Sequence, residues 1–65
     1  MALNSNDRND IIKVAKEKGY SWNSDQTKMI NQSGGFLKFS ETGQSVKIKD
    51  SSYNSTSGAK NSSKW

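Results

Sequence analysis

Apolar and polar positions alternate between residues 36 and 49, with one interruption at 41–44. A period of two residues is typical of a β-strand that buries one face. The pattern predicts a hairpin with strands at 36–40 and 45–49, and Gly43 supplies conformational freedom to the turn between them. The predicted buried face of this hairpin consists of Leu37, Phe39, Val46 and Ile48.

A helical pattern precedes the hairpin. Ile11 and Ala15 lie one helical turn apart and define a narrow apolar stripe, so we expect a helix at about residues 7–18. Asn6 is the predicted N-cap, because its side chain can accept a hydrogen bond from the first turn. Gly19 is the predicted stop, because glycine readily adopts the left-handed conformation that ends many helices.

The segment between helix and hairpin is less regular. Tyr20 and Trp22 alternate with polar residues and predict a short strand at 20–23 with both rings on one face. Residues 24–33 fit either a second strand at about 28–31 or a helix at 25–32. We favour the strand, because Met29 and Ile30 are the only apolar residues there and make too narrow a stripe for a packed helix.

These elements predict an α+β fold in which one N-terminal helix packs on an antiparallel sheet of about three strands, including the C-terminal hairpin. Residues 1–50 would form this small domain. Residues 51–65 are rich in Ser and Asn and predict a flexible tail. The expected core is formed by Ile11, Ala15, Tyr20, Trp22, Leu37, Phe39, Val46 and Ile48.

Composition limits the chemistry. The chain has no Cys and no His, so disulfides, a structural zinc and histidine-based proton transfer are excluded. The six acidic residues fall at the predicted helix or beside predicted turns, where structural roles account for them. We therefore expect no enzymatic activity, no catalytic or metal-binding residues and no cofactor.

Positive charge is the remaining functional signal. The formal net charge is +4 and the calculated pI is about 9.6, which favours anionic partners. The face of the hairpin opposite the predicted core carries Lys38, Lys47 and Lys49, together with Phe36. This combination can contact phosphates while the ring stacks on a base. Exposed lysines on a two-stranded edge also serve solubility, and the sequence leaves both interpretations open.

Three other aromatic residues are candidates for binding a protein partner. Tyr20 and Trp22 fit a small core as well as a binding surface. Trp65 ends the chain in the predicted tail, where nothing in the sequence indicates burial.

The layout also resembles the HicA mRNA-interferase toxins, whose small domain is similar to the double-stranded-RNA-binding fold. The resemblance rests on Ile11-Ile12 through Lys18-Gly19-Tyr20, on Gln32 to Phe39, and on Gly43 with Val46-Lys47-Ile48. It implies an RNA-binding surface. The catalytic His of that family is replaced by Phe36, so the resemblance implies no cleavage, and the family's final helix is not expected because 51–65 lacks an apolar stripe.

The sequence thus predicts a small basic, non-catalytic accessory protein that binds nucleic acid, RNA rather than DNA. The alternative is a protein-binding module or inhibitor from a phage or mobile element that engages a host protein. A homodimer is compatible with the small core. No apolar run is long enough for a signal-peptide core or a membrane span, so we expect a cytoplasmic protein with no membrane partner.

Overall fold

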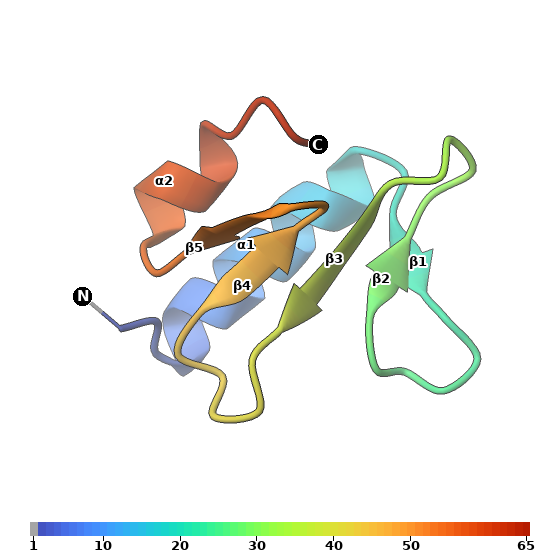
Figure 1. The fold of residues 1–65 in the computed structure, drawn as a ribbon. Helices are drawn as coiled ribbons and strands as arrows, with labels where there is room; N and C mark the ends of the chain where they lie inside the picture. Colours follow the sequence, from blue (N-terminus) through green and yellow to red (C-terminus); the bar gives the residue numbers. More distant parts are fainter. Residues whose placement is uncertain (1) are drawn as a thin grey trace.

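The computed structural model describes residues 2–65, which form two helices and one antiparallel sheet (Figure 1). The elements follow the chain in this order: α1 (Ser5–Glu17), β1 (Ser21–Trp22), β2 (Met29–Ile30), β3 (Phe36–Phe39), β4 (Val46–Ile48), β5 (Ser51–Tyr53) and α2 (Thr56–Lys60). Each strand pairs with the next, so the sheet is a five-stranded meander. The α+β class is confirmed, but the sheet has five strands rather than about three, and the helices are not confined to the N-terminus.

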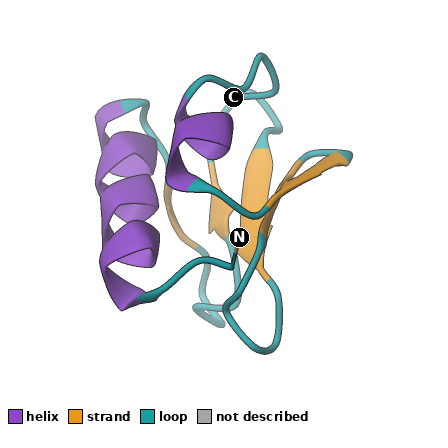
Figure 2. Cartoon of the chain, turned by 90° about the vertical axis from the view of Figure 1, so that its left-hand side faces the viewer, coloured by secondary structure: helices purple, strands orange, loops and turns teal. Residues whose placement is uncertain are grey.

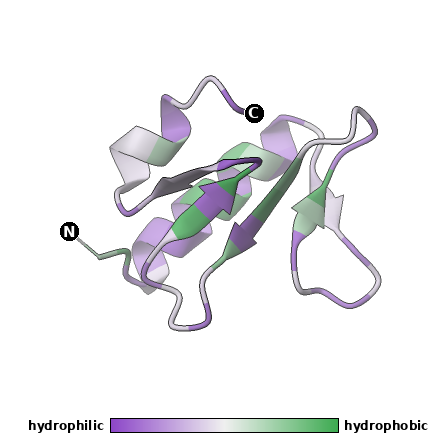
Figure 3. Ribbon diagram, in the orientation of Figure 1, coloured by the Kyte–Doolittle hydropathy of each residue, from purple (hydrophilic) through white to green (hydrophobic). Residues whose placement is uncertain are grey.

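Both helices lie on the same side of the sheet (Figure 2). Ile11 and Ala15 of α1 and Ala59 of α2 are fully buried against that side. The sheet supplies Met29, Leu37, Val46 and Ile48 to the same core. Figure 3 shows the alternation of hydrophobic and hydrophilic residues along β3 and β4 that creates this buried face.

Helix α1 begins two residues earlier than its sequence predicts. Asn4, not Asn6, is the N-cap: its Oδ1 accepts a hydrogen bond from the Asp7 N–H at 2.8 Å, and the Asp7 carboxylate accepts one from the Asn4 N–H at 3.1 Å. This reciprocal capping box needs an acceptor three residues after the cap. With Asn4 as the cap, that position is Asp7, whose carboxylate accepts the hydrogen bond. With Asn6 as the cap, the position would be Asn9, which has a neutral amide instead of a carboxylate. Gly19 ends the helix with a φ of 91°, as expected.

Residues 51–65 form β5 and α2 instead of the flexible tail that their composition predicts. The helix α2 was not expected from the sequence, because residues 51–65 lack an apolar stripe. Strand β5 is held by backbone pairing with β4, which needs no apolar side chains. Ser55 caps α2 by accepting a hydrogen bond from the Gly58 N–H at 3.2 Å. Composition is a poor guide here because backbone pairing, a helix cap and the packing of a few residues, Tyr53, Ala59 and Trp65, on the core order the segment together.

The end of the chain is attached to the domain by polar contacts. The Trp65 indole N–H donates to the Ala59 carbonyl at 2.8 Å. Lys64 Nζ lies 3.3 Å from Asp50 Oδ1, and this hydrogen-bonded ammonium lowers the pKa of the Asp50 carboxyl. Because Asp50 is exposed, the ion pair contributes little to stability.

Candidate nucleic-acid interface

The face of the sheet opposite the helices, here called the outer face, is not covered by either helix (Figure 2). Strand register decides which side chains it carries. Leu37 pairs with Ile48 on the buried face, and the next pair, Lys38 with Lys47, lies on the outer face. Lys38 and Lys47 are exposed, as their parity predicts.

A row of three lysines crosses the outer face. Met29 pairs with Leu37, so continuing that register by one residue places Lys28 beside Lys38. The Asn23 N–H donates to the Lys28 carbonyl at 3.0 Å, which extends the pairing of β1 and β2 to this position. We call Lys28, Lys38 and Lys47 the lysine row.

No acidic side chain of residues 2–65 forms an ion pair with the lysine row. Among residues 2–65, the single ion pair within 4.0 Å joins Lys64 to Asp50, away from this row. Like charges placed directly opposite each other on neighbouring strands destabilise a sheet. The row is therefore a concentration of positive charge that the fold itself does not need.

An apolar pair lies beside the lysine row. Ile30 and Phe36 are cross-strand partners and share the outer face. Ile30 is 38% exposed, and Phe36 is half-buried without joining the core. The Lys28 Nζ lies 5.4 Å from the centroid of the Phe36 ring, within the range of a cation–π contact.

Lys49 lies beside this face in a turn, not in the strand that its alternation predicts. Strand β4 ends at Ile48, and Lys49 and Asp50 form the two-residue connection to β5. The Lys49 N–H donates to the Phe36 carbonyl at 3.0 Å, so Lys49 lies opposite Phe36 across the strands. Its φ of 56° is in the left-handed region that glycine adopts without steric cost.

We expect Lys49→Gly to raise the free energy of unfolding by about 0.5–1 kcal/mol, because it removes the steric cost of a β-carbon at positive φ. Urea unfolding of the variant and of the parent checks this value. Lys47→Gly is the control, since the same change inside β4 should destabilise the protein. A loss of stability in Lys49→Gly would contradict the prediction.

A shallow hollow lies over part of the outer face. Seven of its lining residues are Phe36, Lys38, Phe39, Ser40, Ser45, Lys47 and Ser52. Glu41, from the turn between β3 and β4, also contributes to the lining. The hollow therefore joins two aromatic rings, two ammonium groups and three hydroxyls, with one carboxylate among them.

The structure separates the three aromatic residues considered for a protein partner. Tyr20 is buried, so its ring is not free to bind. Trp65 is not exposed in a tail: its ring packs edge-on against Tyr20 at 5.5 Å between centroids, and Lys18 Nζ lies 5.7 Å from its centroid. Trp22 shares the helix-facing side of the sheet with Met29 but stays 38% exposed. Only Trp22 of the three presents a substantial surface.

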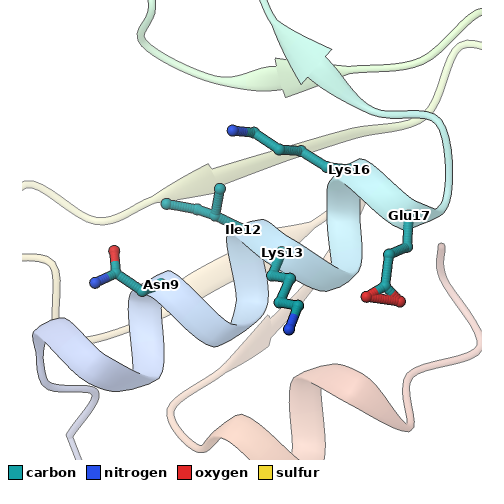
Figure 4. Close-up of a pocket in the computed structure, with 5 residues that line it drawn as sticks. All are labelled: Asn9, Ile12, Lys13, Lys16 and Glu17. Atoms are coloured by element: carbon teal, nitrogen blue, oxygen red, sulfur yellow. The ribbon is translucent and has the colours of Figure 1, made fainter.

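A second hollow follows α1 on the other side of the molecule. It is lined by Asn9, Ile12, Lys13, Lys16 and Glu17, with Ile12 and Lys16 pointing to one side of the helix and Lys13 and Glu17 to the other (Figure 4). Because α1 covers the buried face of the sheet, its lysines do not extend the lysine row. This hollow also carries charges of both signs, because Glu17 lines it together with Lys13 and Lys16.

Sequence alternation predicted four residues of the candidate interface, and the structure adds two more. Lys38, Lys47, Lys49 and Phe36 are brought together on or beside the outer face. Lys28 and Ile30 were missed, because their side of the sheet depends on how β2 pairs with β3. The sequence indicates that Lys28 and Ile30, two residues apart, share one face of a strand. It does not indicate whether that face is the buried or the outer one.

No family model, curated protein or solved structure matches this chain. Across residues 2–65, neither helix has the length and apolar content needed to cross a membrane. The same residues contain no group of three metal-ligating side chains placed to hold an ion.

Proposed function

We propose that this protein is a non-catalytic nucleic-acid-binding accessory protein whose binding surface is the outer face of the sheet. The observation that carries the proposal is the lysine row beside Phe36 and Ile30. Lysine ammonium groups bind phosphates without regard to sequence, and such contacts supply most of non-specific nucleic-acid affinity. The resemblance to the HicA family implies RNA, so RNA is the first ligand to test.

The charge distribution supports this use of the outer face. A solubility role requires exposed charge but does not require lysines to face each other across neighbouring strands. Direct opposition costs folding free energy, whereas a phosphate placed between two such ammonium groups relieves the repulsion. The arrangement is thus unfavourable in isolation and favourable with an anionic polymer bound.

The test is fluorescence anisotropy with a labelled RNA 12-mer at a series of salt concentrations. We expect Lys38→Ala/Lys47→Ala/Lys49→Ala to bind at least about tenfold more weakly at low salt, and to reduce the slope of log affinity against log salt by about 2. The matched control is Lys13→Ala/Lys16→Ala/Lys60→Ala, which removes the same charge from the two helices. Circular dichroism verifies that both variants remain folded.

Absence of RNA binding by the parent at low salt would refute the proposal. Equal weakening by the two triple variants would also count against it, because only net charge would then matter. A specific surface requires the sheet variant to lose more affinity than the helix variant.

Trp22 supports one second candidate, a protein-binding module. Its exposed ring lines a groove together with Ile12 and Phe39, between α1 and the sheet. Affinity capture after nuclease treatment separates the two functions. One stoichiometric protein that is retained by the parent and lost with Trp22→Ala favours this second candidate, whereas nuclease-sensitive capture favours the first.

A further inference from the structure

The outer face is organised in two parallel rows that run across the strands. One row contains Ile30, Phe36 and Lys49, and the other is the lysine row. Phe36 and Lys38 lie two residues apart on one strand, so their Cα atoms are separated by roughly 6.6 Å along β3. Neighbouring strands are about 4.8 Å apart, so the three members of the lysine row span roughly 10 Å. An apolar track therefore lies directly beside a cationic track.

We infer that the ligand of this face is a single-stranded nucleic acid that crosses the strands, with an unpaired base stacked on Phe36 and its backbone following the lysine row. This inference rests on the proposed function and names the class of nucleic acid. Bases of a single strand expose their faces and can stack on aromatic side chains. In a duplex both faces of each base are covered by its neighbours, so a duplex can use the lysines but not the ring.

The surroundings of Phe36 fit this role. Its half-buried ring is anchored by the sheet but does not belong to the core, so it combines a fixed position with an accessible surface. Ile30 beside it extends the apolar surface, as a second base or a sugar would require. An apolar pair of this kind contributes nothing to solubility, in contrast to the lysines around it.

Two lysines lie close to the Phe36 ring. The Lys28 Nζ lies over the ring, 5.4 Å from its centroid, where a stacked base would displace it, and Lys49 lies opposite Phe36 in the turn that follows β4. A base stacked on Phe36 would therefore have its own phosphate, and the phosphate of the next nucleotide, within reach of lysines. Lys28 joins the binding residues on this ground.

The decisive variant is Phe36→Leu, which keeps an apolar side chain of similar size and removes the aromatic face. We expect it to bind a labelled single-stranded A12 RNA or DNA roughly 5- to 150-fold more weakly than the parent does, the range for loss of one base–aromatic stack. Its affinity for a 12-base-pair duplex should stay within twofold. Phe36→Tyr, which keeps the ring, should bind both ligands as the parent does.

The A12 RNA and the A12 DNA carry the same bases and phosphates. The strand that the parent binds with higher affinity therefore shows whether the natural ligand is RNA or DNA. Unchanged single-strand binding by Phe36→Leu, with binding still lost in the sheet triple-lysine variant, would overturn the single-strand inference and leave the proposed function intact. Equal weakening of single-strand and duplex binding by Phe36→Leu would overturn the inference too, because it would show a general loss of the surface. If the parent binds neither ligand, both proposals fall. Thermal unfolding of each variant shows whether the fold is retained.

Discussion

A chain that ends at residue 50 is expected to be unfolded, although residues 51–65 are among the most polar of the protein. The deletion removes β5 and α2 together, and with them the fully buried Ala59. It also exposes Tyr20, which packs against Trp65, and leaves the hydrogen-bonding edge of β4 unpaired. A domain of this size has only about 3–5 kcal/mol of stability, which these combined losses exceed.

Circular dichroism and thermal unfolding of residues 1–50 measure this effect, and the expected outcome is the loss of a cooperative transition. A point variant tests the same idea in the full chain. Ala59→Asp should cost about 3 kcal/mol or more, because it buries a carboxylate without a partner. Ser57→Asp introduces the same group at an exposed position of α2 and should change stability by less than about 0.5 kcal/mol. A folded 1–50 fragment with parental thermal stability would show that β5 and α2 are dispensable.

The second large effect concerns β2, whose two residues face opposite sides of the sheet. Met29 is completely buried in the core between the sheet and the helices, whereas Ile30 is 38% exposed on the outer face. We expect Met29→Ala to lower the free energy of unfolding by about 2–5 kcal/mol, because it removes a core side chain and leaves a cavity. Ile30→Ala should cost less than about 1 kcal/mol, since it removes a side chain that is already partly in water.

Urea unfolding of the two variants gives both values, and nucleic-acid titration adds a second comparison. Ile30→Ala should weaken binding of single-stranded RNA while leaving stability nearly unchanged, which separates the binding face from the core. Equal destabilisation by the two substitutions would be inconsistent with the orientation of β2 in this structure.

These cases indicate how far a local pattern reaches. The hairpin strands and α1 were predictable within a few residues, because a period of two or of 3.6 residues is visible within one segment. The same alternation correctly assigned Leu37 and Val46 to the buried face of the hairpin and Lys38 and Lys47 to the exposed face. Tyr20 was predicted to be buried and is, whereas Trp22 lies at the margin of the core because β1 is a short edge strand.

The candidate site was predictable only in part, for the same reason. Lys38, Lys47 and Phe36 belong to the hairpin, and their common face follows from alternation alone. Lys28 and Ile30 join them through the pairing of β2 with β3, which involves residues that are distant in sequence. Lys49 differs again, because a tight turn rather than a strand determines its conformation.

The sequence by itself determined a helix ended by Gly19, a hairpin with an apolar and a lysine-bearing face, and a chain without Cys or His. Only the tertiary structure decided the strand register that aligns Lys28 with Lys38 and Lys47, the orientation of Met29 and Ile30, and the ordering of residues 51–65. The physical reason is the range of the interactions. Side-chain periodicity and capping act over a few residues, whereas backbone pairing and the burial of Ala59 need partners that folding brings together.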